Sequence, residues 1–153
     1  MVTNDLIAPE FYNITEELQK FSQDSERQAI RWLNTQQEHR TVSYVELVQK
    51  MNQYAHAFTK KGLQKGDCVL VITPRLPEAY FVFLGCLKAG IVPISCSEML
   101  RASDLEYRME HSSASAVIAF EAFTGEVDRI TSSVEALKKT NWLSELLQVI
   151  GRR

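Results

Sequence analysis

The stretch GDCVLVITPRLPEAYFVFLGCLKAG, Gly66 to Gly90, decides the fold of this chain. Its first part, Cys68 to Thr73, is an uninterrupted run of aliphatic and β-branched residues, which is typical of a strand covered on both faces. Pro74 ends this strand, and Pro77 suits the first turn of a helix, where its missing N–H would have no partner anyway. The helix from Glu78 to Ala89 is apolar nearly all round, so neighbours must bury it on several sides.

The segment after Gly90 continues the alternation of strands and helices. Ile91 to Ile94 is a second short strand, and strand, helix and strand in this order require a right-handed crossover with parallel strands. A polar link, Ser95 to Arg101, leads to a capping box, Ser103 to Glu106, and a helix through about His111. Ala116 to Ala119 is then predicted to be a third parallel strand.

Near the end of the chain the sequence predicts one further helix, and the last residues have two possible interpretations. A helical stripe is formed by Phe123, Val127, Ile130, Val134 and Leu137. Gly125 weakens the helix propensity of its first turn. Residues Trp142 to Ile150 fit a short helix by the spacing of their leucines, while Leu146 to Ile150 also fits a strand.

The segment before Gly66 is predicted to form a helix, a hairpin and a longer helix. Thr15 to Phe21 fits a short helix capped by Thr15. Gln28 to Leu33 and Arg40 to Ser43 fit two strands joined by a long polar loop, with Trp32 as the apolar anchor. Ser43 to Glu46 has the form of a capping box that starts an amphipathic helix, which Gly62 ends.

Length and composition predict one α/β domain, residues 1–153, with helices layered on both faces of a mainly parallel sheet and a short N-terminal hairpin. The chain is 45% hydrophobic and 24% charged, with a net charge of −2. This balance gives no electrostatic reason to expect nucleic acid or an anionic membrane as partner. The longest apolar run is too short to span a membrane, and the acidic N-terminus does not fit a secretion signal, so we expect a cytoplasmic protein.

Residues that usually carry catalytic or metal chemistry do not form a recognisable motif. The three cysteines, Cys68, Cys86 and Cys96, have no paired spacing, and we expect buried reduced thiols rather than reactive ones. The histidines have no partner at ligand spacing. The glutamate pairs, among them Glu121 and Glu126, are interpreted as solvated helix faces. The sequence therefore predicts no catalytic residue and no metal site.

The segment from about Phe11 to Phe120 resembles the N-terminal part of acyl-CoA synthetases, members of the adenylate-forming (AMP-binding) enzyme family, and most closely the medium-chain acyl-CoA and acetyl-CoA synthetase-like branch. The residues that carry the resemblance are Tyr12-Asn-Ile14, Ala29-Ile-Arg-Trp32, Thr41 to Leu47, Gly62 to Val69, Pro74 to Glu78, Phe83 to Gly90, Met99-Leu100 and Asp104 to Arg108.

The resemblance implies a carboxylic acid:CoA ligase that uses ATP, magnesium and coenzyme A to form an acyl-adenylate and then a thioester. In the family this chemistry depends on a Ser/Thr/Gly-rich loop ending in lysine, an aromatic-Gly-x-Thr-Glu segment, a ribose-binding aspartate and a C-terminal lysine. None of these is present in this sequence. We therefore expect an N-terminal fragment that is inactive alone, and no catalytic residue is carried over.

The resemblance also bears on partners, because in the family this region belongs to a much larger N-terminal domain. An uncovered sheet edge or apolar helix face should then remain, which favours self-association or binding of the rest of a synthetase in trans. Two alternatives stay open: a non-catalytic partner or regulatory subunit of a synthetase, and an unrelated flavodoxin-like ligand-binding domain with a five-stranded sheet.

Two positions are candidates for contacting a substrate or nucleotide. Arg75 lies in the loop after the first parallel strand, and Ser97 lies in the link after the second. Ligands of open α/β sheets bind beyond the carboxyl ends of the strands, which is where both residues are expected. The alternative interpretation is that both belong to solvent-exposed connectors.

Overall fold

The structure, a computed structural model, describes residues 12–130. The chain divides into two compact units, residues 1–48 and residues 49–153, and each is described by itself. The single-domain organisation expected for residues 1–153 stays a prediction.

The first unit begins with helix α1 (Ile14–Phe21), whose cap differs from the prediction. Asn13, not Thr15, caps the helix: its Oδ1 accepts from the Thr15 N–H at 2.9 Å and from the Thr15 hydroxyl at 2.8 Å. Thr15 is buried within the first turn. The prediction placed the cap two residues late because threonine and asparagine are both good capping residues.

A hairpin follows, formed by β1 (Gln28–Leu33) and β2 (His39–Ser43) as predicted. The strands are antiparallel, and half-buried Trp32 pairs with Arg40. Asn34 organises the connecting loop, since its Oδ1 accepts from the backbone N–H groups of Gln36 and Glu38, both at 2.9 Å.

Helix α2 (Tyr44–Lys60) starts at the predicted residue, but its N-terminal contacts are only partly those of a capping box. The Ser43 hydroxyl accepts from the Glu46 N–H at 3.2 Å, as expected. The Glu46 carboxylate accepts from the Arg40 guanidinium at 2.8 Å. At the other end Gly62 has a φ of +96°, and the Leu63 N–H donates to the Phe58 carbonyl, which confirms the predicted stop.

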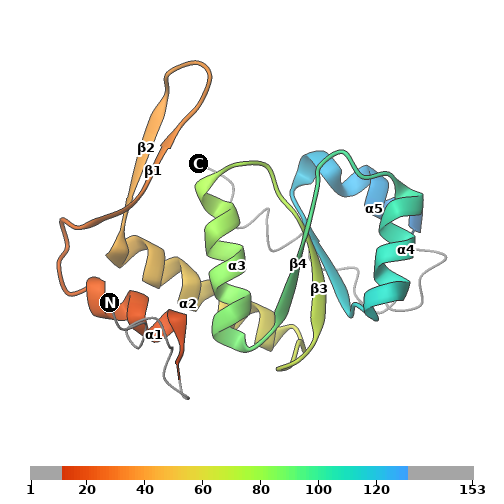
Figure 1. Cartoon of the computed structure of the whole chain (residues 1–153), viewed down its shortest axis with the longest axis horizontal. Coiled ribbons are helices and arrows are strands. Elements are labelled where there is room, and N and C mark those ends of the chain that lie inside the picture. The colour runs from red at the N-terminus through yellow and green to blue at the C-terminus, as the bar shows by residue number, and fades with distance from the viewer. Residues whose placement is uncertain (1–11, 131–153) are drawn as a thin grey trace, which may run out of the picture. The chain divides into compact units, whose positions relative to one another are not determined.

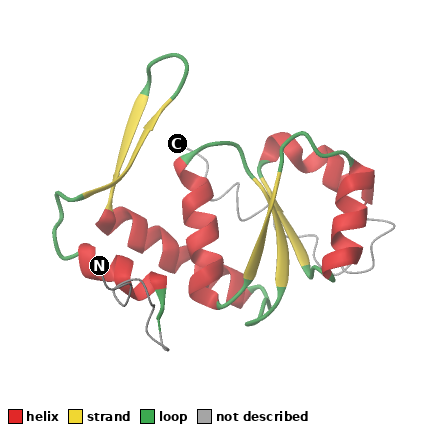
Figure 2. Ribbon diagram, viewed as in Figure 1, coloured by secondary structure: helices red, strands yellow, loops and turns green. Residues whose placement is uncertain are grey.

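The second unit contains a parallel sheet of β3 (Cys68–Ile72), β4 (Val92–Cys96) and β5 (Ala116–Ala119), in the order β4-β3-β5. Figure 1 shows α3 (Pro77–Ala89) on one face, and α4 (Ala102–Ser112) and α5 (Thr124–Ile130) on the other. Figure 2 shows the same layers by type of element. A 3₁₀ turn, η2 (Glu121–Phe123), joins β5 to α5. The layered α/β/α prediction is confirmed.

Two boundaries in this unit differ from the predictions. Strand β4 continues to Cys96, so the first two residues of the expected polar link are part of the sheet. Helix α4 begins at Ala102, which places Ser103 inside the first turn instead of at the cap. The cap is Arg101, whose N–H donates to the Asp104 carboxylate at 3.0 Å. Arginine has no side-chain acceptor, so the contact from within the helix comes from Asp104.

The core on the α4 and α5 face is built from alternate strand residues. Leu70 and Ile72 of β3 belong to it, because alternate side chains of a strand point to the same face. The buried members of this cluster are Leu70, Ile72, Cys96, Leu105, Met109, Ala114, Val117, Ala119 and Ile130. Val69 and Val71 alternate with them and are also fully buried, so both faces of β3 are covered, as the apolar run predicted.

Gly85 lets α3 lie directly on the second half of α2. A Cβ atom at this position would lie 2.5 Å from the Tyr54 Cβ and 3.2 Å from the Ala55 backbone nitrogen. Both atoms belong to the backbone or to the root of a side chain, so neither can move without shifting the helix. A glycine is therefore required at the crossing of the two helices.

Some predictions fall outside the described residues: the stripe positions Val134 and Leu137, and the two readings of Trp142 to Ile150. Between residues 12 and 130, no helix is long and apolar enough to cross a bilayer.

We predict that Gly85→Ala destabilises the chain by about 1–3 kcal/mol, because the added methyl group overpacks the contact between α2 and α3. The measurement is urea unfolding followed by circular dichroism. Gly125→Ala is the matched control: Gly125 lies in α5 and an added Cβ would meet nothing within 4 Å. This variant should gain roughly 0.5–1 kcal/mol from helix propensity. Equal responses of the two variants would contradict the close approach.

Candidate functional site

A cavity of about 320 Å³ lies at the carboxyl end of the sheet, where ligands bind in open α/β sheets. Ile72 at the end of β3, Leu105 of α4 and Phe123 of η2 form its apolar part. Its polar part comes from Glu98 and Arg101 in the link before α4, and from Glu126 and Arg129 in α5. The cavity therefore lies between the end of β3 and the helices α4 and α5.

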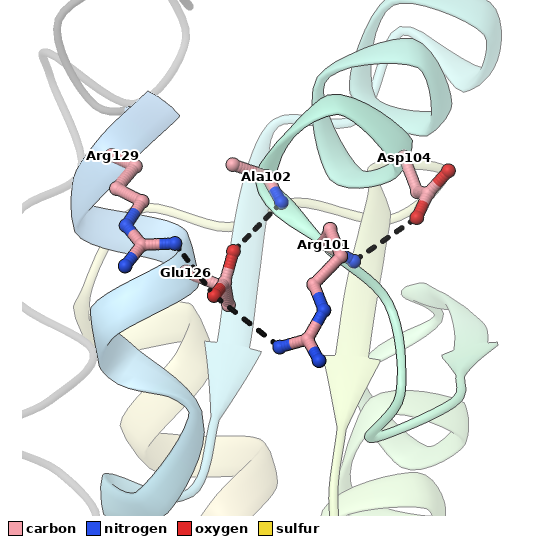
Figure 3. A network of polar contacts seen from close by, with 5 residues as sticks. All are labelled: Arg101, Ala102, Asp104, Glu126 and Arg129. Atoms are coloured by element: carbon pink, nitrogen blue, oxygen red, sulfur yellow. Dashed lines mark hydrogen bonds and ion pairs between the residues drawn. The ribbon is translucent and has the colours of Figure 1, made fainter.

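Glu126 is the centre of a polar network in this cavity (Figure 3). Its Oε2 accepts from the backbone N–H of Ala102, the first residue of α4, at 2.9 Å. Its Oε1 accepts from Arg129 Nη1 at 2.8 Å and lies 3.7 Å from Arg101 Nη1. The Glu126 side chain is 20% exposed, whereas those of Arg101 and Arg129 are 76% and 69% exposed.

This geometry determines what the cavity can do chemically. A helix N-terminus beside two guanidinium groups favours a negative charge. Glu126 already supplies that charge, since its carboxylate caps α4 and binds both arginines. The contact links α5 to α4 across 24 residues of sequence. Glu126 is therefore a positioning residue for the link that ends at Arg101.

The described residues of this cavity do not offer a ligand set for the cation of a magnesium–nucleotide complex. A metal-bound triphosphate needs unpaired donors for its phosphates and free oxygen ligands for the cation. Here the Glu126 carboxylate accepts the N–H of Ala102 at the start of α4 and one N–H of Arg129, and it lies 3.7 Å from Arg101 Nη1. Within residues 12–130, no three histidine, cysteine or acidic side chains are grouped as metal ligands would be.

The two residues predicted to contact a ligand lie at this end of the sheet, as the strand order requires. Arg75 follows β3 and is exposed. Ser97 follows β4 and is exposed, and its hydroxyl accepts from the Met99 N–H at 3.2 Å within its own turn. Neither residue lines the cavity, to which the link after β4 contributes Glu98, Leu100 and Arg101. A role for Arg75 and Ser97 in binding stays a prediction.

Sequence reasoning missed Glu126, which it placed with Glu121 on a solvated helix face. The structure corrects this: Glu126 is mostly buried and has three partners, while Glu121 is exposed. The only local signal was Arg129 three residues later, a spacing that pairs charges on one helix. Its contact with Ala102 depends on the packing of α4 against α5, which no local pattern gives.

The thiol, phenol and imidazole groups are positioned as structural groups. Burial raises the pKa of the Cys86 thiol to about 12, and burial also raises the pKa of Cys96. The pKa of Tyr54 rises to about 12, first because of burial and second because of the charge of Glu78. His39, His56 and His111 are exposed. These observations favour the expectation of unreactive thiols for Cys86 and Cys96.

The sequence pattern of the AMP-binding enzyme family matches residues 19–150 of this chain. The chain belongs to this family. Its membership agrees with the resemblance found in the sequence and removes the support for an unrelated flavodoxin-like domain.

Individual relatives of this AMP-binding chain are acyl-CoA ligases. An uncharacterised acyl-CoA ligase of Bacillus subtilis, YtcI, is 43% identical over 121 residues, which cover 79% of this chain and 23% of that protein. Human mitochondrial acyl-coenzyme A synthetase ACSM1 is 32% identical over 143 residues, which cover 88% of this chain and 25% of that protein. The chain thus spans about a quarter of the length of these curated relatives.

A solved structure shares the fold of this AMP-binding chain. The N-terminal domain of FACL13 from Mycobacterium tuberculosis superposes with a TM-score of 0.70 at 23% identity. The match covers 83% of this chain and 31% of that domain. Most of the length of that single domain therefore has no counterpart in this chain.

We predict that Glu126→Gln destabilises the chain by about 1–2 kcal/mol, because the neutral amide weakens the contacts with Arg101, Arg129 and the start of α4. Thermal and urea unfolding measure this loss. Glu121→Gln, the same change at an exposed position of the adjoining turn, should stay within about 0.5 kcal/mol of the parent chain. A similar loss for both variants would show that the network contributes nothing.

We also predict that Cys86 and Cys96 do not react with a disulfide reagent such as DTNB in the folded chain at pH 8. Only the thiolate attacks, and burial holds the pKa of both thiols above their ordinary value. The number of titrated thiols should rise to all three in 8 M urea. Rapid titration of all three without denaturant would contradict the buried placement.

Proposed function

We propose that this chain is the opening part of the N-terminal domain of an acyl-CoA synthetase, a carboxylic acid:CoA ligase. The observation that carries the proposal is the match of residues 19–150 to the AMP-binding enzyme family, together with relatives whose names identify acyl-CoA ligases. The fold supports it, because the chain superposes over 83% of its length on the N-terminal domain of FACL13.

The proposed whole enzyme activates a carboxylic acid in two steps. The carboxylate attacks the α-phosphate of ATP, which gives an acyl-adenylate and releases pyrophosphate. The thiol of coenzyme A then attacks the acyl carbon and AMP leaves. A magnesium ion would offset the charge of the phosphates in the first step.

In this proposal the present chain contributes scaffold and loop positions rather than catalytic groups. Its sequence lacks the lysine-ended phosphate loop and the other motifs on which the family's chemistry depends. In its cavity the Glu126 carboxylate already binds the N–H at the start of α4 and one N–H of Arg129. We therefore propose that the chain alone is inactive and that Arg75 and Ser97 face the substrate only in a complete domain.

The cytoplasm is the proposed compartment of the enzyme. Three free cysteines, two of them buried, suit a reducing environment. The acyl chain that the enzyme prefers is left open in the proposal, because the residues that select it in the family lie mostly beyond this sequence.

The test compares the chain alone with a chimaera. In the chimaera, this chain replaces the matching segment of the Bacillus subtilis acyl-CoA ligase. Both proteins are supplied with ATP, magnesium, coenzyme A and a panel of fatty acids, and pyrophosphate release is measured. We expect no release above background from the chain alone, and acid-dependent release from the chimaera. Turnover by the chain alone, or a folded chimaera without turnover when the parent ligase is active, would refute the proposed function.

A further inference from the structure

The outward strip of α3 is apolar along its whole length. Tyr80 and Leu87 lie two turns apart on the same side of the helix and are 58% and 44% exposed. Phe83 and Leu84 lie between them on that side and are half-buried. We call these four residues the α3 strip. The opposite side of α3 is buried and includes Phe81, Val82, Gly85 and Cys86.

The α3 strip differs from the outward faces of the neighbouring helices. The exposed residues in the second half of α2 are polar or charged: Asn52, Gln53, His56, Thr59 and Lys60. The exposed residues of α4 are Ser103, Asp104, Tyr107, Arg108, Glu110 and His111. A helix that meets water normally has a polar face, so a strip made only of large apolar side chains marks an interaction surface.

The β4 edge of the sheet is a poorer surface for a partner than the α3 strip. The Val92 N–H donates to the Asp67 carbonyl, and the parallel register pairs Val92 with Cys68. Alternate residues of a parallel strand bond to the same neighbour, so Val92 and Ile94 bond to β3, while Pro93 and Ser95 face the other edge. Proline has no N–H, which leaves Ser95 as the donor that this edge offers. A proline facing outward is a known protection against strand addition.

We infer that the α3 strip is the surface on which the remaining part of an acyl-CoA synthetase N-terminal domain packs, through side chains rather than by adding a strand to β4. The inference rests on the proposed function. The occupant is argued from length: the match covers 31% of the solved FACL13 domain, so more than half of such a domain is available to cover this helix. The curated relatives carry the matching segment as about a quarter of one longer chain.

The experiment places a charge on the strip in two contexts. Leu87→Glu is made in the full chain alone and in the chimaera with the Bacillus subtilis ligase. Gln53→Glu adds the same charge at an exposed polar position of α2 and is the matched control. Melting temperatures are measured by circular dichroism, and the mass of the chain alone is measured by light scattering.

We expect Leu87→Glu to lower the melting temperature of the chimaera by about 5 °C or more, because the carboxylate would be buried without a partner. The same change in the chain alone should leave its melting temperature within about 2 °C, since Leu87 is exposed there. Gln53→Glu should leave both proteins unchanged. Leu87→Met, which keeps the volume and the apolar character, should behave as the parent chimaera.

A second measurement is used if the chimaera does not fold. The full chain is co-expressed with the Bacillus subtilis ligase that lacks the matching segment. Co-purification of the two proteins is then measured with and without Leu87→Glu. Loss of co-purification with this variant alone supports the inference. Equal effects of Leu87→Glu and Gln53→Glu overturn the inference. A homodimer of the chain that only Leu87→Glu dissociates also overturns it, because a second copy of the chain would then cover the α3 strip. The inference is also overturned if, without any substitution, the chimaera does not fold and the co-expressed proteins do not co-purify.

The outcomes separate this inference from the proposed function. If the chimaera folds, releases pyrophosphate and tolerates Leu87→Glu, the proposed function stands and the packing surface on α3 is refuted. If the folded chimaera is inactive but loses stability with Leu87→Glu, the packing surface on α3 stands and the proposed function is refuted.

Discussion

The constraint on which the structure depends is the burial of β3 on every side. This strand bonds to β4 at one edge and to β5 at the other, and its residues from Val69 to Ile72 are almost fully buried. A strand with aliphatic side chains on both faces cannot leave either face in water, so a helical layer is needed on each. Gly85 follows from the same constraint, because it allows α2 and α3 to pack closely on one side of the sheet.

The polar contacts at the carboxyl end of the sheet connect the two helices, α4 and α5, that cover one face of the sheet. Helices α4 and α5 share the apolar cluster around Leu105 and Ile130, and Glu126 connects their ends by capping α4. The carboxylate takes the place that an anion could otherwise have at the start of α4.

The elements with strong local signals were predicted well, and those with competing signals were not. The apolar run of β3 and the proline and glycine that bound α3 have one physical interpretation each, and the structure agrees with all of them. The caps of α1 and α4 were each misplaced by two residues, because good capping residues such as Thr15 and Ser103 also lie just inside the first turn. Glu126 was missed because its partner Ala102 is distant in sequence and contributes only a backbone N–H.

The sequence by itself determined the layered α/β class, the parallel strands and the family, because these depend on periodicity, on turn residues and on motifs that are local along the chain. Tertiary structure alone decided the strand order, the need for glycine at position 85, the network around Glu126 and the apolar strip on α3. Each of these depends on which elements become neighbours. A helix that is apolar all round in sequence shows which side it buries and which side it leaves open only when the sheet and the adjoining helix are in place.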